Sequence, residues 1–211
     1  MKNLLEKIAT KLYEGEEEKV RELVQEAVDD GIGASEVLQG GLIAGMDEVG
    51  KDFKAGDLFV PEVLIAARAM HAGMSVLRPL LVEGDTPGGA KYVIGTVKGD
   101  LHDIGKNLVK MMLEGAGFET VDLGTDVEPQ AFVDAVREHN PAVLGMSALL
   151  TTTMVQMKAT IDGLIEASLR DSVKIMVGGA PVTQAFAKDI GADAYAPDAA
   201  SAVDLARELT T

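Results

Sequence analysis

Hydrophobic residues recur at helical spacing through the first 80 residues of the chain. In four segments an apolar side chain returns every three or four positions, which places these side chains on one face of a helix. Pro61 stands where the first turn of the fourth helix is expected, and Pro79 follows its end. Four short helices over this length predict a small helical bundle. The segments run over residues Leu4–Leu12, Val20–Val28, Val37–Val49 and Pro61–Leu77.

From residue 92 onward, apolar runs of strand length alternate with helical segments. Helices are expected near residues 104–115 and 129–138, and a last helix is expected to end near Leu209. This alternation is typical of a doubly wound parallel sheet, and five strands most often take the flavodoxin-like order 2-1-3-4-5. The expected strands cover residues 92–97, 120–123, 142–146, 174–177 and 193–196.

Residues 83–90 separate these two patterns. They are turn formers without periodicity, in the order Glu-Gly-Asp-Thr-Pro-Gly-Gly-Ala. We therefore predict an α/β protein with two domains. An N-terminal four-helix bundle covers residues 1–85, a linker covers residues 86–90, and a flavodoxin-like (Rossmann-type) domain with a five-stranded parallel sheet covers residues 91–211.

Composition and charge exclude several classes of function. Acidic residues outnumber basic ones by 34 to 19, and the net charge of −15 repels phosphate backbones and anionic lipid. Nucleic acid and membranes are therefore not expected partners. The chain has no cysteine, which excludes disulfides, thiolate metal sites and cysteine nucleophiles. The sequence shows neither a signal-peptide core nor a run of about 18 apolar residues, so we expect a cytoplasmic protein.

Polar residues and glycines follow the strands that flank the expected switch point, where doubly wound sheets bind ligands. The loop after the first strand carries Asp100 and His102, and Ser147 follows the third strand. These three side chains are expected to form a hydrogen-bonded chain through the imidazole. A histidine that ligates a metal usually gives its other N–H to a carboxylate. The alternative is a solvent-exposed loop histidine without a role.

Other chemistries fit these residues less well. A Ser-His-Asp hydrolase places its nucleophile on a Gly-x-Ser-x-Gly turn, and the segment 145–149 lacks the second glycine. No phosphate-binding glycine motif follows the first strand. Ser147 stands where a phosphoacceptor receiver domain has a carboxylate, and zinc requires three or four ligands. The remaining option is a cofactor that brings its own metal and takes one axial imidazole from the protein.

At these positions the sequence resembles the cobalamin-binding module of methionine synthase and its relatives. The resemblance rests on Asp100-x-His102-x-x-Gly105, then Ser147-x-Leu149, then the pair 178–179, Gly-Gly, in the order and at the separations of that family. The segments 45–53, 59–63 and 66–70 resemble its helical cap module. A free-standing chain of this length is similar to the small corrinoid proteins that shuttle methyl groups between two methyltransferases.

The resemblance implies a role for each matching residue. His102 would be the lower axial ligand of cobalt, Asp100 would hold the other imidazole nitrogen, and Ser147 would extend a proton relay. The glycines of the motifs, at residues 105, 178 and 179, would permit close approach of a nucleotide tail, although glycine also suits ordinary turns. Phe53 and Val60 would lie over the upper corrin face, although both also suit the bundle core. The further cofactor-binding residues implied are Asp103, Gly105, Leu149, Gly178 and Gly179.

The resemblance also implies a methyl carrier that is not catalytic alone. Its cofactor would be cobalamin or a related corrinoid, methylcobalamin when loaded. As cob(I)alamin it would accept a methyl group from a substrate-specific methyltransferase of the O-demethylase, methanol, methylamine or betaine type. A second methyltransferase would pass the group to tetrahydrofolate, and a reductive activase would restore the corrinoid. The alternatives are a cobalamin subunit of an adenosylcobalamin-dependent mutase, which usually lacks the helical cap, a cobalamin sensor or storage protein, or a flavodoxin-like domain that binds no corrinoid.

Overall fold

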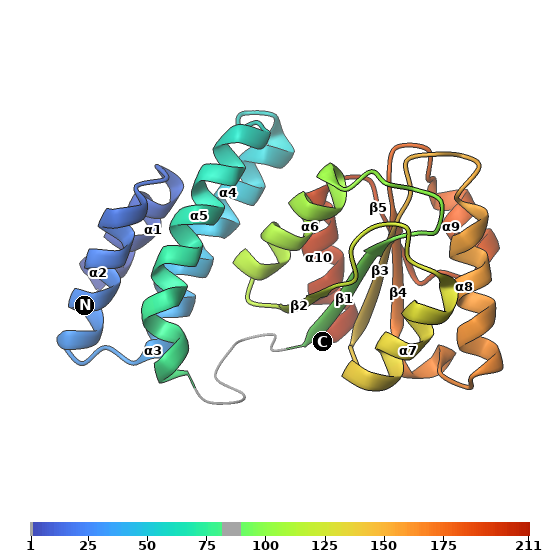
Figure 1. Cartoon of the computed structure of the whole chain (residues 1–211). Helices are drawn as coiled ribbons and strands as arrows, with labels where there is room; N and C mark the ends of the chain where they lie inside the picture. The colour runs from blue at the N-terminus through green and yellow to red at the C-terminus, as the bar shows by residue number, and fades with distance from the viewer. Residues whose placement is uncertain (1, 82–89) are drawn as a thin grey trace. The chain divides into compact units, whose positions relative to one another are not determined.

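The computed structural model describes residues 2–81 and 90–211, which form a helical unit and an α/β unit (Figure 1). Both fold types agree with the sequence prediction. Residues 86–89 of the predicted linker lie outside the described residues. The domain limits at residues 85 and 91 stay predictions.

The helical unit contains the four helical segments that the hydrophobic spacing predicts. The third segment differs from the prediction, because it is continuous from residue 34 to residue 55 and includes one π-helical stretch. Its glycines lie against α1: a Cβ atom on Gly41 would lie 3.0 Å from Ile8 Cγ2, and one on Gly45 would lie 2.9 Å from the carbonyl oxygen of Ala9. The elements are α1 (Lys2–Tyr13), α2 (Glu17–Asp29), α3 (Ala34–Val37), η1 (Leu38–Ile43), α4 (Ala44–Ala55), α5 (Val60–Leu77) and the 3₁₀ turn η2 (Arg78–Leu80).

Helix α5 is the most apolar element of this unit. By length and composition alone, the stretch Val60–Leu80 could cross a membrane. It passes that test although it contains Glu62 and Arg68, which is why no uninterrupted apolar run marks it in the sequence. Eight of its residues are buried within the protein, and we interpret it as the core helix of the bundle. These residues are Val63, Ala66, Ala67, Ala69, Met70, Ala72, Gly73 and Leu77.

The α/β unit is a parallel five-stranded sheet in the order β2-β1-β3-β4-β5, as predicted. In Figure 1, α6 and α10 cover one face of the sheet, and α7, α8 and α9 cover the other. The strands agree with the predicted ranges to within one residue at either end. Helices α8 and α9 were not predicted. The elements are β1 (Lys91–Thr96), α6 (Ile104–Gly115), β2 (Glu119–Asp122), α7 (Pro129–His139), β3 (Val143–Ser147), α8 (Val155–Glu166), η3 (Arg170–Ser172), β4 (Lys174–Gly178), α9 (Gln184–Ile190), β5 (Ala194–Ala196) and α10 (Ala199–Thr210).

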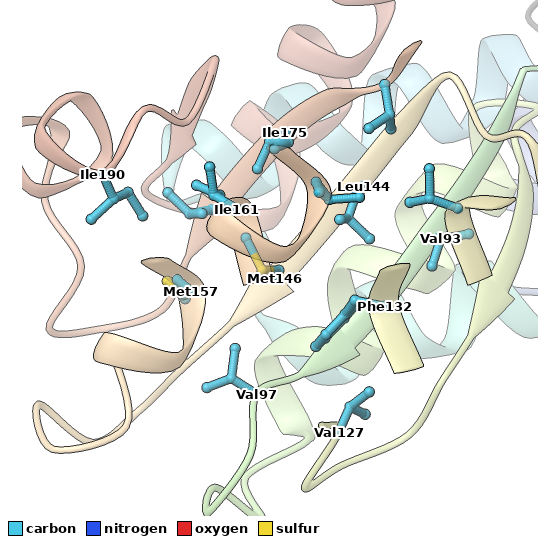
Figure 2. Close-up of a cluster of buried hydrophobic side chains, with 14 of the residues drawn as sticks. Val93, Val97, Val127, Phe132, Leu144, Met146, Met157, Ile161, Ile175 and Ile190 are labelled. Carbon is cyan, nitrogen blue, oxygen red and sulfur yellow. The ribbon is translucent and has the colours of Figure 1, made fainter. Parts of the chain in front are cut away.

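A hydrophobic cluster fills the space between the sheet and helices α7, α8 and α9 (Figure 2). Phe132 of α7 is fully buried in it, and a Cβ atom on Gly95 of β1 would lie 2.8 Å from its ring. The missing side chain at residue 95 is therefore what leaves space for the phenyl ring. Strands and helices both contribute to the cluster, among them Val93, Leu144, Met146, Met157, Ile161, Ile175 and Ile190.

The other face of the sheet buries Tyr92 in the same manner. Its ring packs edge-on against Phe118, with the two ring centroids 6.5 Å apart, and its hydroxyl donates to Met176 Sδ at 3.4 Å. Burial raises the pKa of the Tyr92 hydroxyl above its usual range. A Cβ atom on Gly145 of the neighbouring strand β3 would lie 2.5 Å from this ring. Tyr92 therefore requires glycine at residue 145.

We expect Gly145→Ala to destabilise the α/β unit by about 1–3 kcal/mol, the usual cost of forcing an extra carbon into a packed core. Urea unfolding followed by circular dichroism measures the change. Gly33→Ala is the matched control, because no atom lies within 4 Å of its Cβ position and its φ of −60° suits any residue. Equal unfolding midpoints for the two variants would contradict the requirement for glycine at residue 145.

Candidate functional site

The carboxyl ends of β1, β3 and β4 bring the three sequence motifs to one edge of the sheet. Thr96, the last residue of β1, pairs with Ser147, the last residue of β3. Ser147 in turn pairs with Gly178, the last residue of β4. Each motif begins at or just beyond these residues, so the strand register alone makes the motifs neighbours.

The side chain of Asp100 is fully buried at this edge and accepts hydrogen bonds on both oxygens. Oδ1 accepts from the backbone N–H of His102 at 3.1 Å and lies 2.7 Å from His102 Nδ1. Oδ2 accepts from the backbone N–H groups of Leu149 at 2.7 Å and Leu150 at 3.1 Å. The hydroxyl of Thr153 lies 3.0 Å from the same oxygen. One carboxylate therefore joins the loop after β1 to the loop after β3.

Asp100 is ionised at neutral pH. Burial raises the pKa of this carboxyl, but hydrogen bonds from the ring of His102 and from the backbone of Leu149, His102 and Leu150 outweigh burial. They hold the pKa of Asp100 well below its usual range. An ionised carboxylate is an acceptor only, and the surrounding backbone N–H groups are all donors. The negative charge of Asp100 is therefore surrounded by hydrogen-bond donors.

His102 combines a fixed ring with an accessible edge. An ionised Asp100 accepts at Nδ1, so Nδ1 carries the proton and Nε2 has a free lone pair when the ring is neutral. The hydroxyl of Thr96 donates to the backbone oxygen of His102 at 2.9 Å and holds the loop from the other side. The side chain of His102 is 52% exposed. An external electrophile such as a metal ion can therefore reach Nε2.

Thr153, and not Ser147, supplies the hydroxyl next to Asp100. No hydrogen bond joins the Ser147 side chain to Asp100 or His102 within residues 2–81 and 90–211, so the expected place of Ser147 in the chain of hydrogen bonds is not the one observed. The Thr153 hydroxyl also lies 2.9 Å from the carbonyl oxygen of Leu150. With one proton, it donates to one of these two acceptors at a time. The only sequence signal for Thr153 is the run of three threonines at 151–153.

The remaining predicted residues of the α/β unit surround this pair. Asp103 is exposed and accepts from the side-chain amide of Asn107 at 3.0 Å. Gly105, in the first turn of α6, has no atom within 4 Å of its Cβ position, so the space beside it is open. Gly178 is the last residue of β4 and Gly179 follows it, and both are half-buried. A Cβ atom on Gly179, whose φ is +121°, would lie 1.9 Å from the carbonyl oxygen of Ala148, so no other residue fits there.

Apolar side chains next to His102 are exposed to solvent. Leu101 is 73% exposed and Ile104 is 79% exposed. Leu149 and Leu150, whose N–H groups bind the same carboxylate as the His102 ring, are exposed as well. Exposed apolar groups gathered beside one polar contact are typical of a ligand site. The site therefore combines an apolar surface with an imidazole nitrogen that a ligand can reach.

The predicted cap residues lie in the helical unit. Phe53 is half-buried near the end of α4, and Val60 is half-buried at the start of α5. The hydroxyl of Tyr13 donates to Asp52 Oδ2 at 2.8 Å and ties α1 to this end of α4. Phe53 and Val60 thus lie on either side of the turn between α4 and α5, and the exposed Phe59 directly precedes Val60 in the chain.

Comparison with known proteins gives one consistent result. Residues 90–204 match the B12 binding domain family, and residues 4–78 match a second family with the same description, B12 binding domain. A corrinoid protein of Desulfitobacterium hafniense is 42% identical, with 98% of this chain and 97% of that protein covered. A dimethylamine corrinoid protein of Methanosarcina barkeri is 45% identical, with 98% and 97% covered.

A solved structure of a cobalamin methyltransferase complex contains a chain with a similar fold. A chain in the crystal structure of the methanol:cobalamin methyltransferase complex MtaBC from Methanosarcina barkeri matches with a TM-score of 0.87 at 33% identity. The match covers 99% of this chain and 80% of that chain. Both matched families are B12 binding domains, and the accessible Nε2 of His102 is compatible with the metal of such a cofactor. This chain therefore belongs to the B12-binding corrinoid proteins, and its cofactor is cobalamin or a related corrinoid.

Proposed function

We propose that this protein carries methyl groups on a corrinoid whose cobalt is ligated by His102. The observation that carries the proposal is the hydrogen bond between His102 Nδ1 and the buried Asp100 carboxylate, 2.7 Å long. It fixes the tautomer that leaves Nε2 available. The relatives named for dimethylamine and methanol systems support the methyl-carrier role.

Different residues around His102 would contact different parts of the cofactor. Leu101, Ile104 and Leu149 offer apolar surface to the ring of the corrinoid. The open space at Gly105 and the absence of side chains at Gly178 and Gly179 admit the nucleotide tail, with Asp103 and Ser147 as polar contacts along it. From the helical unit, Phe53 and Val60 remain the residues that we propose as cofactor contacts.

When bound, the corrinoid supplies a cobalt centre that takes up and releases a methyl group. The protein's contribution is the ligand and its proton. The ionised carboxylate of Asp100 would stabilise the positive charge of an imidazole that carries a second proton. The Thr153 hydroxyl lies within hydrogen-bond distance of both Asp100 and the backbone oxygen of Leu150. We infer that Nε2 of the imidazole would exchange a proton with solvent if it left or bound the metal, and that Asp100 and Thr153 would hold the ring in place in either state.

The partners follow from this role. A substrate-specific methyltransferase donates the methyl group, a second methyltransferase passes it to tetrahydrofolate, and a reductive activase restores the corrinoid after oxidation. All three partners and the protein itself would act in the cytoplasm. The protein by itself holds the group and has no substrate of its own.

We expect His102→Ala to change the spectrum of the bound corrinoid. Wild-type protein reconstituted with hydroxocobalamin and desalted should keep the corrinoid bands and show the shift caused by an imidazole ligand. In His102→Ala the bands should stay and the shift should disappear. His139→Ala, which removes a histidine at the end of α7, is the matched control and should behave as wild type.

Two results would contradict this assignment. Identical spectra for wild type and His102→Ala would remove His102 as the ligand while leaving corrinoid binding in place. A colourless wild-type protein after desalting would contradict the binding of corrinoid itself.

We expect Thr153→Val to weaken corrinoid binding, because it removes a hydroxyl that supports the Asp100 carboxylate. Losses of 10–100-fold are usual when the group that supports a metal ligand is removed, and we expect about tenfold here. Spectroscopic titration with hydroxocobalamin measures the affinity. Thr152→Val is the control, since that neighbouring threonine is exposed. An unchanged affinity in Thr153→Val would exclude the hydroxyl from the site.

We expect Asp100→Asn to remove part of the pH dependence of stability. The pKa of Asp100 is lower in the folded chain than in the unfolded chain, so ionisation favours the folded state. This contribution is complete above the unfolded pKa, about 3.9, and is lost as the pH falls through the folded value. Urea unfolding of the corrinoid-free proteins should therefore show a difference between wild type and variant at pH 7 that narrows toward pH 3.

The control for this comparison is Asp134→Asn, which changes an exposed carboxylate paired with Arg137 on α7. It should follow the wild-type curve closely. A constant difference between wild type and Asp100→Asn from pH 7 to pH 3 would show that the carboxylate contributes no charge-linked stability.

A further inference from the structure

The loop that carries Asp100 and His102 is held by a second loop, between β2 and α7. The backbone N–H of Thr96 donates to the oxygen of Gly124 at 2.9 Å, and that of Val127 donates to the oxygen of Thr96 at 3.0 Å. Residues 97 and 127 also form an isolated parallel bridge. The second loop therefore runs beside the first one beyond the end of the sheet.

Asp126 extends this contact to the residues next to the site. Its carboxylate Oδ1 accepts from the backbone N–H of Gly99 at 2.7 Å, and its own N–H donates to the oxygen of Asp100 at 3.0 Å. The two hydrogen bonds flank the backbone of residue 100. Asp126 has a φ of 55°, a left-handed conformation that aspartate and asparagine adopt more readily than most residues.

We propose that Asp126 is a positioning residue for His102, acting through the backbone of residues 99 and 100. This inference rests on the proposed function of His102 as the cobalt ligand. The Asp100 carboxylate meets donors from three places in the chain, at residues 102, 149–150 and 153. Displacement of its backbone by a fraction of an ångström would misalign several of these bonds together.

Two contacts near this backbone act differently from Asp126. The N–H of Asp100 donates to the oxygen of Val97 at 3.1 Å, which closes a turn within the loop without tying it to anything else. Lys98 and Glu128 form an ion pair of 2.7 Å between the two loops. Both side chains are about half exposed, and exposed pairs contribute little. Asp126 is therefore the side chain that fixes the place of residue 100 relative to the second loop.

Two substitutions at residue 126 distinguish the effect of its side-chain acceptor from the effect of its backbone conformation. Asp126→Gly keeps the left-handed conformation without strain and removes the acceptor. Asp126→Asn keeps both a side-chain oxygen and a residue type that tolerates this conformation. Glu128→Gln removes a nearby carboxylate that pairs with the side chain of Lys98, and serves as the control.

The first measurement uses corrinoid-free protein. Amide hydrogen exchange at Gly99, followed by nuclear magnetic resonance, should be roughly three- to tenfold faster in Asp126→Gly than in wild type, the effect of losing one hydrogen bond. Asp126→Asn and Glu128→Gln should stay near the wild-type rate. Equal Gly99 exchange in wild type and Asp126→Gly would overturn the proposal whatever the cofactor does.

The second measurement uses protein reconstituted with hydroxocobalamin. In Asp126→Gly we expect roughly three- to tenfold weaker binding and a smaller fraction of protein with the imidazole-dependent spectrum, while Asp126→Asn restores both. An Asp126→Gly protein with faster Gly99 exchange but wild-type affinity and spectrum would overturn the link to His102. Identical corrinoid spectra for wild type and His102→Ala would instead refute the proposed function. That outcome does not depend on the exchange rate of Gly99.

Discussion

The arrangement of the site depends on one buried charge. A carboxylate without exposed surface is costly unless its oxygens are hydrogen-bonded, and Asp100 has partners for both oxygens within 3.1 Å. The carboxylate needs these donors, and the donors in turn lose their acceptor if the carboxylate moves. Asp100 therefore holds His102, Leu149 and Thr153 in one mutual geometry.

The sheet makes this geometry available. Parallel strands end at a common edge, and the register that pairs the ends of β1, β3 and β4 brings three loops together there. Close approach of the loops after β3 and β4 then depends on Gly179, where any side chain would meet the carbonyl oxygen of Ala148. Ala148 N–H donates to the oxygen of Gly178 at 3.2 Å. This contact fixes the start of the segment whose next two N–H groups bind Asp100.

The sequence predicts those parts of the fold and site that depend on spacing along one element. The strand bounds and the Asp100–His102 contact, two residues apart, are of this kind, while the strand order follows from the usual order of doubly wound sheets. The choice between Ser147 and Thr153 depends on how the loop after β3 turns, and spacing carries no information on that path. Helix α8 escaped prediction because Thr160 lies on its buried face while Val155 and Ile165 are exposed, which blurs the apolar periodicity. Helix α9 has only seven residues.

The difference in exposure between Asp100 and His102 is what the proposed ligation of cobalt by His102 requires. If the imidazole were buried like Asp100, a bulky ligand could not reach Nε2. If the carboxylate were as exposed as His102, water would compete for the Nδ1 proton and the tautomer would no longer be fixed. A corrinoid brings its own equatorial ligands, so under the proposed ligation the protein supplies one correctly oriented nitrogen. A buried anion beneath a half-exposed imidazole meets this need with two side chains and leaves the surrounding surface free for apolar contact.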